Sequence, residues 1–179
     1  MSSKNAVLVW EITGFIFINV VGTLLHFVFV WFGRWRPLAL IAAVNESTWE
    51  HLKIAFWPAL CFALVEYRYL RRGTNNFMLA KTVSLYTMPV LIILLFYAYL
   101  WIIGHDVLLL DILIFVVAIG IGQMVSFRVL TSKSGSKLNG RAWTLLLILT
   151  LAFLLFTFSP PHMVLFKDPI TGGYGIVVP

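Results

Sequence analysis

The sequence predicts an all-α fold, a polytopic transmembrane helix bundle with about five crossings, in a single integral membrane domain over residues 1–179. Of the 179 residues, 61% are hydrophobic and 11% are charged, whereas soluble domains are roughly half apolar and a quarter charged. The apolar residues also fall in runs that approach or exceed the roughly 20 residues needed to cross a bilayer. We therefore expect lipid to be the main solvent of this chain.

Five runs are long enough to cross, at residues 6–32, 47–70, 77–103, 107–129 and 142–158. The first run follows only Lys4 and is longer than the core of a signal peptide, so we expect it to be retained. Pro160 and Pro161 end the last run, because proline cannot continue the helical hydrogen bonds. Residues 37–44 are apolar but too short to span, which predicts an interfacial or re-entrant segment.

The cations indicate an orientation. Cytoplasmic loops carry an excess of lysine and arginine, and nine of the cations lie on one side of the predicted crossings, against four on the other. The nine are Lys4, Arg68, Arg71, Arg72, Lys81, Arg128, Lys133, Lys137 and Arg141, and the four are Arg34, Arg36, Lys53 and Lys167. This predicts a cytoplasmic amino terminus, an outer carboxyl terminus and residence in a plasma membrane, most simply a prokaryotic inner membrane.

The same charges limit the partners. The formal net charge of +6 could suggest nucleic acid, but the cations are mostly confined to segments between apolar runs, where they act as topology signals. We expect the lipid bilayer as partner and no nucleic acid, and the sequence leaves the oligomeric state open. Residues 131–139, rich in Ser, Lys and Gly, predict a flexible cytoplasmic loop.

With this topology all four histidines lie near the outer surface: His26, His51, His105 and His162. We expect the sequence around His105, with Asp106 and Asp111, to be a solvated loop. Glu11 and Glu66 lie near the cytoplasmic ends of their crossings and are expected to reach the interface. The tail, residues 159–179, has prolines and glycines that specify turns, so we expect it to fold over the outer mouth of the bundle.

The densest polar stretch is residues 45–53, Asn-Glu-Ser-Thr-Trp-Glu-His-Leu-Lys. Ser47 followed by Glu50 fits a capping box at a helix start. If the helix extended back to Glu46, then Glu46, Glu50 and Lys53 would share one face, with His51 on its flank. A charged face that enters a membrane usually looks into a bundle or a wet cavity, so the stretch predicts a site.

These residue types suit two kinds of chemistry. Neutral imidazole and carboxylate are ligands of zinc or another borderline divalent metal, and the candidate metal ligands are His26, His51, His162 and Asp168. Glu46, Glu50, His51 and Lys53 are the candidate catalytic residues, with the acids as ligand or general base and Lys53 as an electrostatic stabiliser. Without a metal, His51 could act as acid and base while Lys53 holds a phosphate or carboxylate.

Residues 45–53, together with the tail stretches Pro-Pro-His at 160–162 and Leu-Phe-Lys-Asp-Pro-Ile-Thr-Gly-Gly-Tyr-Gly-Ile at 165–176, resemble the signature stretches of an uncharacterised family of small prokaryotic multi-pass membrane proteins. The similarity runs almost end to end. It implies the same multi-pass architecture and draws attention to these two segments. The family has no established activity to transfer.

Three functions remain open at this point. The leading hypothesis is a membrane-embedded enzyme, metal-assisted, with an outward-facing site that acts on a lipid or a lipid-linked group. The second is a solute-binding or transport subunit with an outward-facing pocket that takes a small molecule. The third is a non-catalytic accessory membrane protein whose polar cluster stabilises the bundle.

Overall fold

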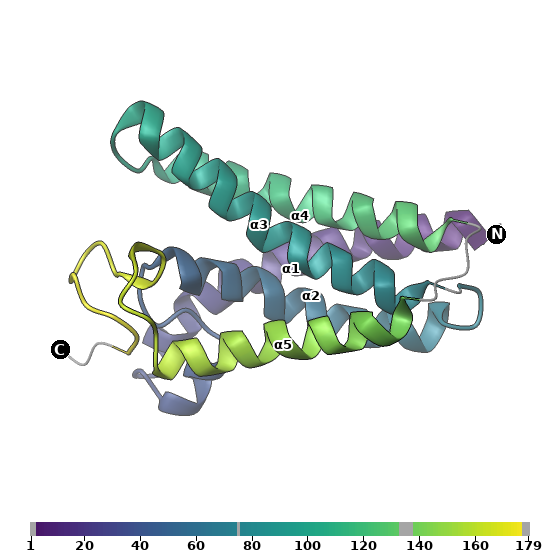
Figure 1. Ribbon diagram of the computed structural model, residues 1–179, viewed down its shortest axis with the longest axis horizontal. Helices are drawn as coiled ribbons and strands as arrows, with labels where there is room; N and C mark the ends of the chain where they lie inside the picture. The colour runs from purple at the N-terminus through teal and green to yellow at the C-terminus, as the bar shows by residue number, and fades with distance from the viewer. Residues whose placement is uncertain (1–2, 75, 133–137, 177–179) are drawn as a thin grey trace.

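The computed structural model describes residues 3–74, 76–132 and 138–176, and within these ranges it contains five α-helices and no β-strand (Figure 1). The helices are α1 (Ser3–Trp31), α2 (Thr48–Leu70), α3 (Phe77–Ile103), α4 (Leu108–Leu130) and α5 (Asn139–Phe158). Two short 3-10 helices, η1 (Arg36–Leu40) and η2 (Val164–Phe166), lie in the connections. The predicted all-helical bundle is confirmed, and each predicted run corresponds to one helix.

Consecutive helices run in opposite directions, so the amino terminus and the tail lie at opposite ends of the bundle (Figure 1). Four helices, α1, α3, α4 and α5, are long and apolar enough to cross a membrane. The fifth, α2, has 23 residues and is about 35 Å long at 1.5 Å per residue. Because α2 runs alongside α1 and α3, the chain passes through the bundle five times.

Helix α2 buries more charged side chains than its neighbours do. Glu50, Lys53 and Glu66 are all buried, whereas α1 and α3 each bury one charged side chain. The other helices expose large apolar side chains along their lengths, as Leu24 and Leu94 do. An apolar outer surface around a charged interior is expected where the solvent is lipid. The composition of α2 therefore reflects contact with protein more than that of the other helices does.

Aromatic side chains connect α2 to α5 and the tail. The ring of Phe153 lies 4.7 Å from the rings of Trp49 and Phe56, and Trp49 also contacts Phe166 at 4.8 Å. Such tilted aromatic contacts add to the packing energy of apolar burial. They fix the first turns of α2 against the last turns of α5.

Gly22 allows α1 and α2 to approach closely. A Cβ at this position would lie 2.8 Å from the backbone oxygen of Ile54 and 2.9 Å from the ring of Phe115. Small residues at helix crossings permit this kind of contact in membranes. The contact holds α1 and α2 together about one turn below His26.

The apolar segment at 37–44 forms η1 and a turn that fold back against α1. Ala39 and Ala42 are fully buried with Phe29, and the backbone N–H of Ala43 donates to the oxygen of Leu25 at 3.3 Å. The segment therefore lies beside the last two turns of α1 and does not form a crossing of its own.

The tail folds onto the same end of the bundle. Ile176 packs against the cluster around Phe29, and the side chain of Asn45 donates to the backbone oxygen of Gly175 at 2.8 Å. Gly175 has a φ of +64°, and a Cβ there would lie 3.1 Å from the oxygen of Thr157. Glycine is needed here for both reasons. The loop predicted at 131–139 lies mostly outside the described residues.

Two expectations about charged residues were wrong. Glu11 and Glu66 do not reach the interface, because both are buried inside the bundle. Lys53 and Lys81 are also buried, so neither is an interfacial cation, and the charge asymmetry becomes eight cations against three. The same side still has more cations, so the predicted orientation, with a cytoplasmic amino terminus, stays a prediction.

Candidate functional site

Three polar side chains meet beside the start of α2. The Nε2 atoms of His26 and His51 are 3.1 Å apart. Oε2 of Glu46 lies 3.4 Å from Nε2 of His26 and 3.6 Å from Nε2 of His51. Among the described residues this is the one group of three or more histidine, cysteine or acidic side chains whose ligand atoms lie close enough for a shared metal ion. We call it the His–Glu–His cluster.

The three distances match those between ligands of a tetrahedral ion. Ligand atoms held about 2.0–2.1 Å from a zinc ion in a tetrahedron are about 3.3–3.4 Å apart, and the distances here average within that range. A point about 2.05 Å from all three atoms lies about 0.6 Å from their plane, against about 0.7 Å in an ideal tetrahedron. The triangle of ligand atoms therefore fits a first-row divalent cation without rearrangement.

Three separate segments supply the cluster. His26 lies near the end of α1, His51 in the first turn of α2, and Glu46 in the loop before it. The side chain of Asn45 accepts a hydrogen bond from the backbone N–H of Ser47 at 2.8 Å, an Asx turn that shapes this loop. The helix begins at Thr48, so the condition for a face shared by Glu46 and Lys53 is not met, and Glu46 lies near the histidines instead.

A backbone contact fixes the tautomer of His51. Its Nδ1 lies 2.9 Å from the carbonyl oxygen of Ser47, and a carbonyl can only accept, so Nδ1 carries the proton. The lone pair of Nε2 in the neutral ring then faces the cluster, as second-sphere contacts of metal-binding histidines arrange. Nδ1 of His26 is buried without a hydrogen-bond partner among the described residues, so nothing comparable fixes that ring.

The cluster is open to solvent on the side of Glu46. The side chains of Glu46, His51 and His26 are 42%, 33% and 25% exposed. The hydrogen bond from His26 lowers the pKa of Glu46 below its ordinary value, against the effect of partial burial, which raises it. The contact therefore stabilises the fold above the ordinary carboxyl pKa and is lost as the pH falls through the lowered one.

Glu50 and Lys53, predicted as catalytic, form a buried ion pair outside this cluster. Nζ of Lys53 lies 2.5 Å from Oε2 of Glu50 and donates to the oxygen of Ala39 at 2.8 Å and to the hydroxyl of Thr157 at 3.1 Å. Oε2 of Glu50 also accepts the N–H of Val44 at 3.1 Å. These contacts hold the segment after η1 against α2 and α5.

The capping box predicted for Ser47 and Glu50 was wrong, because Glu50 pairs with Lys53. Ser47 occupies the position before the helix, but its side chain makes no capping hydrogen bond. The carboxylate of Glu50 is occupied by Lys53 and Val44 and does not reach back to Ser47. The residue pattern fits a cap, yet the buried lysine is the stronger partner for the acid.

His162 and Asp168, predicted as further metal ligands, have other neighbours. The ring of His162 stacks on Tyr174 at 4.5 Å. The carboxylate of Asp168 accepts the N–H of Ile170 at 3.1 Å and the hydroxyl of Thr171 at 2.5 Å. Asp168 therefore stabilises a turn of the tail, and neither residue is part of the His–Glu–His cluster.

The hairpin of α3 and α4 ends on the same side of the bundle as the cluster (Figure 1). The hydroxyl of Tyr99 hydrogen-bonds to Asp111, and the hydroxyls of Thr48 and Tyr97 lie 3.4 Å apart. Asp111 lies one turn into α4 and is partly buried. It is therefore not part of a solvated loop.

A second buried cluster was missed by the sequence reasoning. Nζ of Lys81 lies 2.8 Å from Oε1 of Glu11 and 2.5 Å from Oε2 of Glu66. These side chains come from α3, α1 and α2, and we call them the Glu–Lys–Glu cluster. A comparison of how far each charged residue lies from its helix end could have found the cluster. Glu66 lies four residues before the end of α2, and Lys81 lies four residues after the start of α3.

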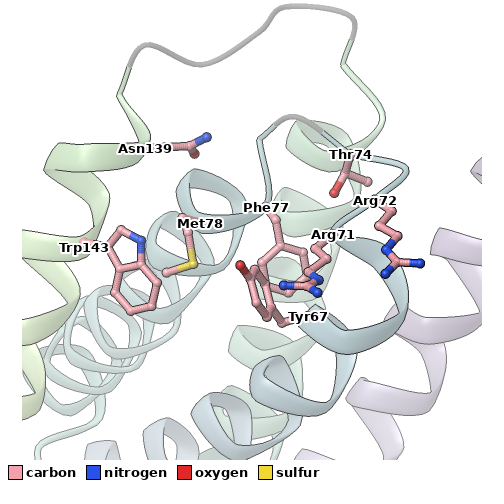
Figure 2. Close-up of a pocket in the computed structure, with 8 residues that line it drawn as sticks. All are labelled: Tyr67, Arg71, Arg72, Thr74, Phe77, Met78, Asn139 and Trp143. Carbon is pink, nitrogen blue, oxygen red and sulfur yellow. The ribbon is translucent and has the colours of Figure 1, made fainter.

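A cavity of about 390 Å³ lies near the end of α2, whereas His51 lies at its start; Figure 2 shows the residues that line the cavity. It lies between the end of α2 and the starts of α3 and α5, and its lining includes Arg71, Arg72 and Trp143. The guanidinium of Arg71 lies over the ring of Tyr67 at 5.3 Å. A second cavity, of about 520 Å³, lies between α3 and α5. Neither cavity contains the His–Glu–His cluster.

Comparison with known proteins gives one family. A model of a family of unknown function, DUF6512, matches residues 1–176, in agreement with the resemblance to an uncharacterised family. No curated protein and no solved structure matches the chain. The five helices and both clusters lie within the matched residues.

Proposed function

The chain belongs to the DUF6512 family, and we propose that this membrane protein binds a divalent metal such as zinc through His26, Glu46 and His51. The observation that carries the proposal is the triangle of ligand atoms with sides of 3.1, 3.4 and 3.6 Å. Two imidazoles and a carboxylate are a ligand set that zinc and other first-row divalent metals accept.

The open side of the cluster favours a reactive site over a structural one. Structural zinc sites use four protein ligands, whereas catalytic sites use three and leave one position free. Three ligands converge here, and Glu46 is 42% exposed. We propose that the substrate is a lipid or a lipid-linked group, because the cluster lies at one end of a bundle whose surroundings are apolar.

The ligand residues have defined tasks in this proposal. His51 is held by Ser47 so that Nε2 stays free for the metal, and Glu46 would supply a carboxylate oxygen. A bound divalent ion would polarise a carbonyl or phosphoryl oxygen as a Lewis acid. The predicted orientation puts this site on the outer face of the plasma membrane.

Transport is the second candidate, and the Glu–Lys–Glu cluster is the observation that favours it. Ionisable residues inside a membrane often mark ion or substrate pathways. In that case metal at the His–Glu–His cluster would be cargo or a structural element. Specific uptake that survives loss of His26 and His51 would support transport. An accessory role would be supported if single substitutions unfolded the protein without changing ligand or activity.

Metal binding is tested on the full chain in detergent micelles after removal of metal with a chelator. We expect one zinc ion per chain by titration calorimetry, and cobalt(II) in its place should give the strong visible absorption of a tetrahedral site. His26→Ala, His51→Ala and Glu46→Gln should each weaken binding by more than the roughly 10–100-fold typical of second-sphere changes.

His162→Ala and His105→Ala are the matched controls, since both remove an imidazole from the same end of the bundle. They should leave the affinity unchanged. Equal losses in His162→Ala and His51→Ala, or no stoichiometric binding by the wild type, would contradict the assignment.

Activity is tested separately with vesicles of phosphatidylethanolamine and phosphatidylglycerol. Release of a headgroup or a lysolipid should require the metal and should be lost in Glu46→Gln. Intact metal binding without turnover of either lipid would count against the enzyme and in favour of the second candidate.

A further inference from the structure

The Glu–Lys–Glu cluster has more acidic than basic groups, and all three side chains are buried. Glu11, Glu66 and Lys81 are 3%, 1% and 4% exposed. Helix α1 contributes Glu11, α2 contributes Glu66 and α3 contributes Lys81. From α4, the uncharged Ser126 donates to the carboxylate of Glu11 and Gln123 donates to its backbone oxygen. Two carboxylates and one ammonium would leave one net negative charge inside the bundle.

Such a charge is costly. An isolated carboxylate in a low-dielectric interior is several kcal/mol less stable than in water, and buried groups usually change their protonation to avoid it. Two carboxylate oxygens in the cluster lack stabilising contacts. Oε2 of Glu11 and Oε1 of Glu66 are buried and have no hydrogen-bond partner among the described residues. The Glu50–Lys53 pair, near the other end of α2, has equal numbers of acids and bases, and neither Glu50 oxygen is among the buried unpartnered atoms of the described residues.

The donors differ between the two acids. Oε1 of Glu11 receives the ammonium of Lys81 at 2.8 Å and the hydroxyl of Ser126 at 2.6 Å. Oε2 of Glu66 receives only Lys81, at 2.5 Å. More hydrogen-bond donors stabilise the ionised form of an acid. Glu11 therefore ionises more readily than Glu66, and we expect the proton on Glu66.

We propose that the Glu–Lys–Glu cluster is a proton-binding site inside the membrane, with Glu66 as the group that holds and exchanges the proton. Glu66 and Lys81 each lie about 6 Å from the nearest helix end at 1.5 Å per residue. The proton therefore exchanges with the end of the bundle where the chain begins, opposite the His–Glu–His cluster. This inference does not depend on metal binding.

Infrared spectroscopy of the full chain in lipid nanodiscs tests the proposal. The wild type at neutral pH, in potassium buffer, should show one carboxylic acid C=O band that shifts in D₂O. Glu66→Gln should abolish it. Glu11→Gln should also abolish it, because Glu66 can then ionise beside Lys81. Lys81→Met should roughly double it, because both acids then need a proton. The double variant Glu50→Gln with Lys53→Met is the matched control and should leave it unchanged.

Two further results identify the atom and the ligand. Glu66→Asp should move the band to a different frequency, whereas Glu11→Asp should leave the frequency in place. If a variant does not fold, the wild-type spectrum still decides. A wild type without an acid band at neutral pH would overturn the proposal, as would loss of the band when sodium replaces potassium, since the ligand would then be a metal cation.

Discussion

Lys53→Met removes the ammonium of the Glu50–Lys53 pair and keeps a side chain of similar length. The change leaves the carboxylate of Glu50 buried without its cation, although the N–H of Val44 still donates to it at 3.1 Å. It also takes the Nζ donor away from the backbone oxygen of Ala39. Helix η1 therefore loses this polar contact with α2.

The expected loss follows from these contacts. Removing one partner of a buried ion pair costs about 3–5 kcal/mol. The backbone oxygen of Ala39, left without its donor, accounts for roughly 1–3 kcal/mol of this total and is not added to it. Lys53 has no exposed surface, so solvent cannot offset the loss. We expect Lys53→Met to lower the free energy of unfolding by about 3–5 kcal/mol.

The double variant Glu50→Gln with Lys53→Met isolates the charge. Replacing both members of a buried pair by neutral groups is often close to neutral, so most of the stability should return. Unfolding by added sodium dodecyl sulfate in mixed micelles, followed by tryptophan fluorescence, measures both variants. Equal losses in the single and double variants would refute the reasoning, and unchanged stability with loss of lipid turnover in Lys53→Met would return Lys53 to the catalytic residues.

Three other changes test the packing and the site. Gly22→Ala should lower the free energy of unfolding by about 1–3 kcal/mol, since its Cβ would lie 2.8 Å from the oxygen of Ile54. Gly120→Ala is the control, because a Cβ there meets nothing closer than 3.5 Å. Equal effects of the two changes would contradict the close contact. Asn45→Ala should weaken zinc binding about tenfold in calorimetry, because the turn that presents Glu46 is lost, and an unchanged affinity would show that the turn is dispensable. Zinc affinity should fall as the solution is made acidic, because protons compete with the metal for its ligand atoms. An affinity that is constant from pH 7 to pH 5 would argue against histidine ligands.

Helices α1, α3, α4 and α5 could be predicted from the sequence because long hydrophobic runs decide them in a membrane. The predicted range 77–103 is the observed α3, and 47–70 differs from α2 by one residue at its start. The prolines at 160 and 161 marked the end of α5 for a local steric reason. These features depend on neighbours along the chain, which a sequence displays directly.

The site was predicted in part. His26 and His51 were grouped because topology puts both at one end, and the structure brings them to 3.1 Å. The place of Glu46 could only be predicted conditionally, because it depends on where the helix starts and on the turn made by Asn45. His162 was grouped on sidedness alone, whereas its actual neighbour, Tyr174, is set by the folding of the tail.

The Glu–Lys–Glu cluster could not be predicted from any one helix. Each of its members is a single charge near the end of an apolar run, and most such charges reach the interface. What makes them different is that three neighbouring helices place opposite charges at the same depth. That comparison requires knowledge of which helices are in contact.

The hydrogen bond between Asn45 and Gly175 joins residues 130 positions apart. A ribosome releases the loop that carries Glu46 long before it releases the glycine that this loop contacts. During synthesis the first two helices are therefore in the membrane while their connecting loop still lacks its last support. For purification, a tag at the amino end leaves this contact undisturbed. A fusion directly after residue 176 would attach another protein one residue from Gly175, which makes the contact.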